Sequence, residues 1–206
     1  MQFRHLEKLP QMAHTNKGVI MAVGHLGNFE WVAQIGAWLE PYGVQSIHVY
    51  RKQKHADQLL NDIRQKHLSG YCEMKQTLRT VIRQYQQDIP TAYGMVADQK
   101  PSPKLKEYMW IPFMGQDTAF LQGVETIARK FNFPVIYGKM MCHKRGYYVT
   151  DIITITENPN DEPRGYITKR YAELLEENIR EQPELWLWSH NRWKYKRTQT
   201  GNHSDN

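Results

Sequence analysis

Long apolar runs and cysteines are both scarce in this 206-residue chain. No stretch approaches the ~18 consecutive apolar residues that a membrane-spanning helix requires, so no segment is expected to cross a bilayer. The first residues also lack the long apolar core of a signal peptide. The two cysteines, Cys72 and Cys142, have no metal-binding spacing, and a reduced, cytoplasmic setting is the simplest interpretation.

Linkers and low-complexity segments are absent as well. A chain of 24.4 kDa is long enough to bury a sizeable core, and its mean hydropathy of -0.71 suits a soluble body. We therefore expect a single domain over residues 1–197, followed by a polar, disordered tail at 198–206.

Positive charge is in excess, with a formal net charge of +6 and a pI near 9.2. Such a balance favours anionic partners, which include phospholipid head groups, acidic carrier proteins and nucleic acid. Charge alone does not choose between them.

Strand-like and helical patterns alternate over the first half of the chain. The predicted strands are 17–24, 44–50 and 91–97, and the predicted helices are 30–40, 55–69 and 74–86. This alternation is typical of a parallel sheet with helices on its faces.

The flanking regions complete the predicted fold. Residues 3–14 have roughly helical spacing, and Thr118 is a candidate cap for a helix at 119–131. Two strands at 133–141 and 147–156 are joined by a glycine-containing turn, and a covering helix follows at 167–181. We predict an α/β fold with a mixed, mostly parallel central sheet flanked by helices and closed by an antiparallel edge hairpin.

The main candidate for chemistry is His25, which stands where the first strand ends and a helix begins. Glu30, five residues later, can turn back toward the imidazole, as a base and its orienter require. No Gly-x-Ser-x-Gly elbow supplies a nucleophile, so such a pair would activate a substrate hydroxyl for direct acyl transfer. The alternative is structural, with His25 satisfied at a helix start and Glu30 solvated.

The motif Gly24-His25-Leu26-Gly27-Asn28-Phe29-Glu30 resembles the first signature of the glycerolipid acyltransferase superfamily, which is a His, four residues, then Asp or Glu. Its form is similar to the branch that adds secondary acyl chains to lipid A. Four further blocks follow in the order of that branch: Val49-Tyr50-Arg51 with Arg64, Ala97-Asp98-Gln99-Lys100, Ile111-Pro112-Phe113-Met114-Gly115, and the stretch from Pro183 to Lys194.

The resemblance implies a glycerolipid-acyltransferase-like fold and an O-acyltransferase that moves a fatty acyl chain from acyl carrier protein or coenzyme A to a lipid hydroxyl. His25 is the implied general base and Glu30 its orienter. The lipid acceptor would be a lipid A precursor, or else a lysophospholipid or acyl-amino-acid lipid. The apolar block 111–115 would lie beside the acceptor and acyl site, although core packing is an equally ordinary use.

Four residues are candidates for binding the phosphate-bearing acceptor, namely Arg51, Arg64, Asp98 and Arg192. Guanidinium groups bind oxyanions through paired, charge-assisted hydrogen bonds. Each arginine could instead be a solvated cation, and Asp98 could cap the turn before Pro101 or orient Arg64 or Arg51. No metal and no cofactor beyond the acyl thioester is expected, because no cluster with ligand spacing accompanies Asp98.

Relatives of this branch carry a membrane helix ahead of the His motif, so we expect this chain to be a truncated form or a fragment. We expect a peripheral protein at the cytoplasmic face of the bacterial inner membrane. The aromatic and basic stretch 186–197 suits either a lipid interface or single-stranded nucleic acid. The His25 context favours lipid, with no nucleic acid expected. Two non-enzymatic alternatives remain, a basic nucleic-acid-binding module and a lipid-binding relative without catalysis.

Overall fold

The computed structural model describes residues 1–50, 69–102 and 108–197. Within these residues seven strands form one sheet in the order β1-β9-β8-β2-β5-β3-β4, and β6 and β7 form a separate pair. The strands are β1 Gln2–Arg4, β2 Gly18–Val23, β3 Gln45–Tyr50, β4 Ser69–Glu73, β5 Thr91–Val96, β6 Tyr108–Phe113, β7 Gln116–Leu121, β8 Val135–Lys144 and β9 Tyr147–Thr156.

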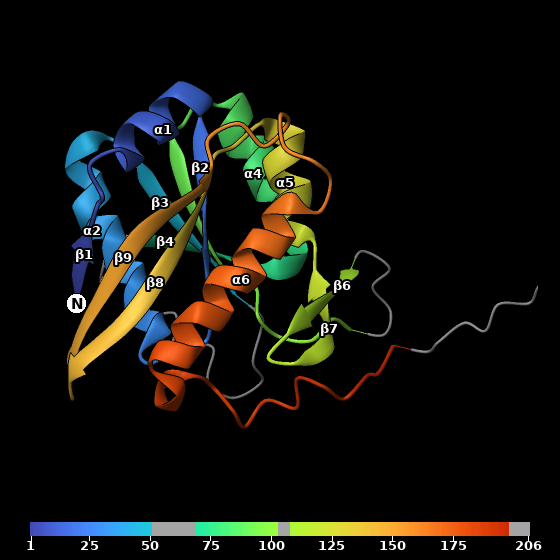
Figure 1. The fold of residues 1–206 in the computed structure, drawn as a ribbon. Helices are drawn as coiled ribbons and strands as arrows, with labels where there is room; N and C mark the ends of the chain where they lie inside the picture. The colour runs from blue at the N-terminus through green and yellow to red at the C-terminus, as the bar shows by residue number, and fades with distance from the viewer. Residues whose placement is uncertain (51–68, 103–107, 198–206) are drawn as a thin grey trace, which may run out of the picture.

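Five neighbouring strands, from β8 to β4, run parallel, while β9 pairs antiparallel with β8. The carboxyl ends of the parallel strands therefore meet at one edge of the sheet, at the bottom of Figure 1. All six residues of β2 are buried, which is typical of a central strand covered on both faces. The predicted α/β fold with a mostly parallel sheet is confirmed.

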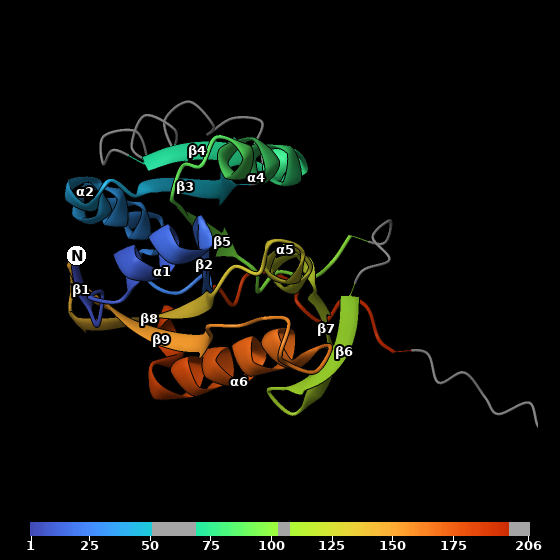
Figure 2. The ribbon, with the colours of Figure 1, turned by 90° about the horizontal axis from the view of Figure 1, so that it is seen from above.

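Helices cover both faces of the sheet. In Figure 2, α1 and α2 lie on one face, and α4, α5 and α6 lie on the other. Their bounds are α1 Leu9–Asn16, α2 Ile35–Leu39, α4 Thr77–Gln86, α5 Gly123–Phe131 and α6 Tyr166–Glu181, with short 3-10 turns η1 Phe29–Gln34, η2 Glu40–Tyr42, η3 Met74–Gln76 and η4 Pro183–Leu185. Each predicted helix of the described residues has a counterpart, but several boundaries differ.

The N-terminal prediction was wrong in its first half. Residues 3–14 were expected to be the tail of a helix interrupted at Pro10, whereas Gln2–Arg4 form the edge strand β1, parallel to β9, and Leu9–Asn16, which include Pro10, form a helix. The hairpin of β8 and β9 is therefore not the outermost part of the sheet. A three-residue strand carries too short an alternation to be distinguished from a helix by periodicity.

The segment predicted as one helix at 30–40 consists of three short pieces, η1, α2 and η2. Asn28 precedes η1 and its side chain does not cap it. After β2 and the loop that follows, the chain therefore winds first as the 3-10 helix η1 and becomes α-helical only at Ile35. This tighter winding follows directly after the loop that contains His25.

The helix predicted at 119–131 begins later, at Gly123, because residues 119–121 belong to β7. Met114 and Gly115 form a two-residue turn between β6 and β7 with φ of 52° and 75°, the combination found in type I′ hairpins. The side chain of Thr118 is therefore buried in a strand rather than capping a helix.

No helix among the described residues is long and apolar enough to cross a membrane. The helix predicted at 55–69 falls almost entirely outside the described residues, as does the tail at 198–206. The single domain over 1–197 stays a prediction.

Candidate active site

The catalytic candidate His25 meets an aspartate where two neighbouring strands end. His25 follows β2, Asp98 follows β5, and the last residues of these strands, Val23 and Val96, are register partners. Nδ1 of His25 lies 2.5 Å from Oδ1 of Asp98, and the backbone N–H of His25 donates to Oδ2 at 3.0 Å. The carboxylate therefore fixes both the ring and the loop that carries it.

A third donor reaches the same carboxylate from the C-terminal part of the chain. Nε1 of Trp186 donates to Oδ2 of Asp98 at 2.9 Å, and both residues are buried. Burial by itself would raise the pKa of Asp98, but the hydrogen bonds and charge interaction with His25 and the hydrogen bond from Trp186 outweigh it and hold the pKa below its usual value. Asp98 is thus a buried anion at neutral pH.

The other ring nitrogen of His25 faces an amide. Nε2 of His25 lies 3.2 Å from Nε2 of Gln99. An ionised carboxylate can only accept, so the proton sits on Nδ1 and the lone pair on Nε2 accepts from the Gln99 amide. The ring of Phe29 packs edge-on at 4.7 Å, and the His25 side chain is 14% exposed. The arrangement is a neutral base with an oriented lone pair near the surface.

Two glycines allow the His25 loop to pack closely. A Cβ on Gly24 would lie 2.6 Å from Leu175 Cδ1 and 2.7 Å from Leu26 Cδ1, so a larger residue there would displace these buried side chains. Gly27 has φ of +51°, and a Cβ there would lie 2.9 Å from Tyr148 Cε1.

The segment after η4 closes the site from the side. Leu26 and Trp186 form an antiparallel bridge, and the backbone N–H of Leu187 donates to the carbonyl of His25 at 3.0 Å. Further along, the backbone N–H of Lys100 donates to Nε2 of His190 at 3.2 Å, and burial together with the charges of Lys100 and Arg192 lowers the pKa of His190.

Arg192 is a buried cation, with 3% of its surface exposed. One of its terminal nitrogens donates to the carbonyl of Ala119 at 2.7 Å, and the guanidinium lies 4.5 Å from the ring centroid of Phe120. Nε and the other terminal nitrogen have no hydrogen-bond partner among the described residues. Burial lowers the pKa of Arg192 to about 10, against the opposing effect of Asp98.

The family model of bacterial lipid A biosynthesis acyltransferases matches residues 1–195. The chain belongs to this family. Membership makes the protein an acyltransferase and supports a lipid as the acceptor of the acyl group. A search of the curated proteins gives no match.

Some of the predicted site residues of the acyltransferase are in contact, one is not part of the contact that was expected for it, and two lie outside the described residues. His25 and Asp98 are in direct contact, but the expected partner of Asp98 was an arginine rather than the histidine. The Nδ1 hydrogen bond expected for Glu30 is made by Asp98, while Glu30 lies half-buried in η1. A catalytic role of Glu30 stays a prediction. Arg51 and Arg64 lie outside the described residues.

Sequence reasoning missed two roles at this centre. Gln99 and Trp186 were noticed only as members of longer motifs, and neither was assigned a contact with the pair. The position of Gln99, one residue beyond Asp98, could have suggested that it faces the same crevice. Trp186 is 161 residues from His25, and no local pattern indicates its bond to Asp98.

The predicted apolar block 111–115 contacts Trp186, which in turn binds Asp98 of the His25–Asp98 pair. Phe113 is buried and packs against Trp186 at 5.9 Å between ring centroids, and the backbone N–H of Met114 donates to Glu176 of α6 at 2.8 Å. Ile111 and Phe113 of this block are buried beside the site, whereas Pro112 and Gly115 are exposed.

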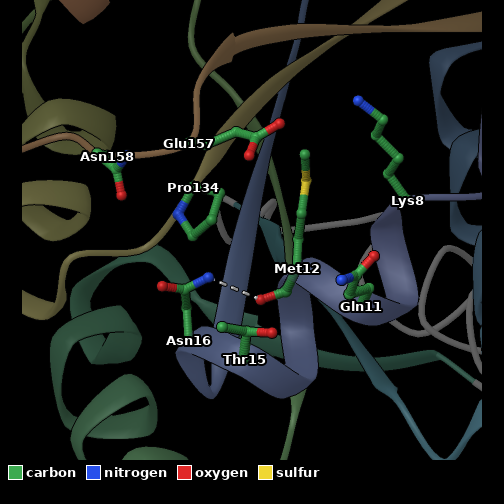
Figure 3. Close-up of a pocket in the computed structure, with 8 residues that line it drawn as sticks. All are labelled: Lys8, Gln11, Met12, Thr15, Asn16, Pro134, Glu157 and Asn158. Atoms are coloured by element: carbon green, nitrogen blue, oxygen red, sulfur yellow. Dashed lines mark hydrogen bonds between the residues drawn. The ribbon is translucent and has the colours of Figure 1, made fainter.

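Two hollows lie beside α1, and neither is lined by His25 or Asp98. The larger, of about 300 Å³, is lined by residues that include Met12, Asn16 and Pro134 (Figure 3). Pro134 directly precedes β8, so this hollow lies near the amino ends of the parallel strands, away from the candidate site. Among the described residues no cluster of three or more His, Cys, Asp or Glu side chains could hold a metal ion.

Proposed function

We propose that the protein transfers a fatty acyl chain from an acyl thioester, on acyl carrier protein or coenzyme A, to a hydroxyl of a lipid A precursor. The observation that carries the proposal is the buried Asp98 carboxylate on Nδ1 of His25, which leaves Nε2 as an oriented proton acceptor. Family membership supplies the acyl chemistry and the lipid acceptor.

The proposed reaction begins when the acceptor hydroxyl replaces the Gln99 amide at Nε2 of His25. The imidazole takes the hydroxyl proton while the oxygen attacks the thioester carbonyl, forming a C–O bond and a tetrahedral oxyanion. Collapse breaks the C–S bond, and the imidazolium gives its proton to the departing sulfur. The products are an ester and a free thiol, and general base catalysis of this kind contributes about 10²–10⁴-fold to the rate.

Asp98 has two tasks in this scheme. It keeps the proton on Nδ1 before the reaction, and its charge stabilises the imidazolium that forms. Three donors already satisfy the carboxylate, two from His25 and one from Trp186. Because those donors are fixed by the fold, the carboxylate needs little reorganisation as charge develops on the ring.

The acceptor phosphate would be bound by arginines. Arg192 is the supported candidate, because two of its buried nitrogens lack partners among the described residues, and unpaired buried donors are costly unless a ligand satisfies them. Arg51 and Arg64 remain part of the proposal through the family resemblance. Glu30 is kept as a second acidic group of the site.

The proposal includes a peripheral location at the cytoplasmic face of the bacterial inner membrane, with acyl carrier protein or coenzyme A thioester as donor. Other acceptors can be compared directly with a lipid A precursor, since a lysophospholipid or an acyl-amino-acid lipid would present a similar hydroxyl and anionic group. Nucleic acid is not expected to bind at the site.

The test is an acyl transfer assay in detergent with acyl carrier protein and coenzyme A thioesters and with each acceptor class. His25→Ala is expected to lower turnover at least 10²-fold. His5→Ala is the matched control, because Nδ1 of His5 also lies 2.5 Å from an aspartate, Asp151, but His5 is exposed and follows the edge strand β1. Glu30→Gln is assayed in parallel. Turnover within threefold of wild type for His25→Ala would reject the proposal.

A further inference from the structure

Large apolar side chains and cations are exposed together at the edge of the sheet where His25 stands. We call this the rim patch and define it as Lys144, Arg145, Tyr147, Leu187 and Trp188. Tyr147 is 61% exposed, Leu187 41% and Trp188 50%, and both cations are exposed. Tyr147 and the cations come from the tip of the β8–β9 hairpin, and the other two follow η4.

Hydrogen bonds connect the two chain segments that carry the rim patch. Gln182, at the end of α6, accepts from the backbone N–H of Cys142 at 2.8 Å and donates to its carbonyl at 2.8 Å. The end of β8 near the hairpin tip is therefore hydrogen-bonded to the end of α6, from which the chain continues through η4 to Leu187 and Trp188.

The rim patch also adjoins the catalytic candidate. The backbone N–H of Leu187 donates to the carbonyl of His25, and the ring of Trp188 lies 4.7 Å from that of Trp186, which binds Asp98. A surface that contacts Leu187 and Trp188 would therefore lie next to the segment that holds the His25 loop and Asp98.

The composition of the rim patch suits the interface of a lipid bilayer. Trp and Tyr rings are favoured at head-group depth, where one end is apolar and the other is wet. The indole of Trp188 has its N–H bound to the carbonyl of Pro183 at 2.6 Å, so its ring can enter an apolar layer without an unpaired donor. Lys144 stands over the Tyr147 ring at 4.3 Å, which combines a cation with an aromatic ring at one point.

The charge balance points to an anionic surface. Lys144 and Arg145 have no acidic partner among the described residues, whereas Glu181 nearby is paired with Lys139. Glu184 in η4 is the opposing charge, and it is exposed. With a net charge of +6 for the whole chain, long-range attraction acts in the same direction.

We propose that the rim patch docks on an anionic lipid bilayer, with Tyr147, Leu187 and Trp188 entering the interfacial layer and Lys144 and Arg145 contacting head-group phosphates. The choice of a lipid partner rests on the proposed function, but docking does not require turnover. In this orientation the acceptor reaches His25 from the membrane plane.

The test is flotation with vesicles of phosphatidylglycerol and phosphatidylethanolamine, compared with vesicles of phosphatidylcholine alone. The protein is expected to bind the anionic vesicles preferentially. Each interfacial cation contributes a factor of about five, so Lys144→Gln with Arg145→Gln is expected to weaken binding about 25-fold. Leu187→Ala with Trp188→Ala is expected to weaken binding to the same vesicles at high salt, where the charge contribution is screened.

Matched controls separate the patch from general charge and hydrophobicity. Arg164→Gln with Lys169→Gln removes the same charge at the opposite end of α6, which is about 24 Å long. Trp38→Ala removes a tryptophan that is 54% exposed on α2, outside the rim patch. Both controls are expected to bind within threefold of wild type.

The result would be different if the surface served another partner. The proposal is overturned if both rim variants bind vesicles as the wild type does. It is also overturned if the rim variants lose binding to acyl carrier protein but keep binding to vesicles. His25→Ala is expected to bind vesicles normally, and the Lys144/Arg145 variant to keep its turnover on a detergent-dispersed acceptor. A failure of the proposed function therefore appears in turnover alone, and a failure of docking in flotation alone.

Discussion

Replacing Asp98 with asparagine tests the centre of the proposed mechanism, because the carboxylate accepts three hydrogen bonds in a fixed pattern. Oδ1 faces Nδ1 of His25, while Oδ2 accepts from the backbone N–H of His25 and from the indole of Trp186. Asparagine offers one acceptor oxygen and one NH₂ group in the same space. The variant therefore cannot satisfy all three donors.

Two orientations of the new amide are possible. If its oxygen replaces Oδ2, the NH₂ faces Nδ1, the ring proton moves to Nε2, and the base is lost. If its oxygen replaces Oδ1, the tautomer is kept but two buried N–H groups face the NH₂, each at about 1–3 kcal/mol. Reaching the active tautomer thus costs about 2–6 kcal/mol, which corresponds to a fall in kcat of about 30-fold to 10⁴-fold.

The assay is kcat for thiol release at saturating donor, together with ¹⁵N NMR of the imidazole, which reports the protonated ring nitrogen. Asp98→Asn is expected to show the proton on Nε2. Asp88→Asn is the control, because this exposed aspartate only pairs with Lys17 at 2.7 Å. A folded Asp98→Asn protein that keeps more than a third of wild-type kcat, or keeps its proton on Nδ1, would refute the reasoning.

The remaining predictions concern the surroundings of the pair and the stability of the fold. Glu125 accepts from the hydroxyl of Thr168, from the backbone N–H groups of Gly165 and Thr168 at the start of α6, and from Arg129. Burial would raise the pKa of Glu125, but these bonds hold it below its usual value. Its contribution to stability is therefore present above about pH 4.3 and lost as pH falls through its lower folded pKa, so Glu125→Gln should cost about 1.5–3 kcal/mol in urea unfolding at pH 7 and less at pH 3. Gly27→Ala should lower the free energy of unfolding more than Gly43→Ala does. Both glycines have positive φ, but only at Gly27 would the added Cβ clash with a neighbour, Tyr148. Equal losses of stability would show that the backbone conformation alone decides. Arg192→Gln should raise KM for a phosphate-bearing acceptor with kcat little changed, and an unchanged KM would remove Arg192 from the acceptor site.

Much of the sheet could be predicted because its central strands are buried on both faces. Continuous apolar runs identify β2 and β5, and the glycine turn identifies the β8–β9 hairpin. The strand ends then place His25 and Asp98 at one edge, which is why both were candidates from the sequence.

The errors have a common cause in short elements whose conformation depends on distant contacts. Residues 119–121 fit a helical stripe, yet they pair with β6 in the hairpin that Met114 and Gly115 allow. Residues 2–4 form the edge strand β1 because they pair with the backbone of β9. Local periodicity contains neither fact.

The assignment of Asp98 shows the same limit for chemistry. A His followed after four residues by Glu suggests a pair within one turn, but η1 winds as a 3-10 helix from Phe29, and the acid that reaches Nδ1 comes from the neighbouring strand. Parallel pairing in register brings residues 73 positions apart to 2.5 Å. Sequence spacing predicts contacts along an element, whereas contacts across a sheet follow from strand order, which only the structure supplies.

The structure divides the residues of the C-terminal stretch 186–197 between the site and the surface. Its tryptophans and cations suggest a surface for lipid, yet Trp186 is buried and holds Asp98, while Trp188 beside it is half exposed. One indole thus stabilises the catalytic candidate and the next faces outward, over a span of three residues. Leu187 between them donates its backbone N–H to the carbonyl of His25, so the half-exposed ring of Trp188 and the loop that carries the base belong to one hydrogen-bonded segment.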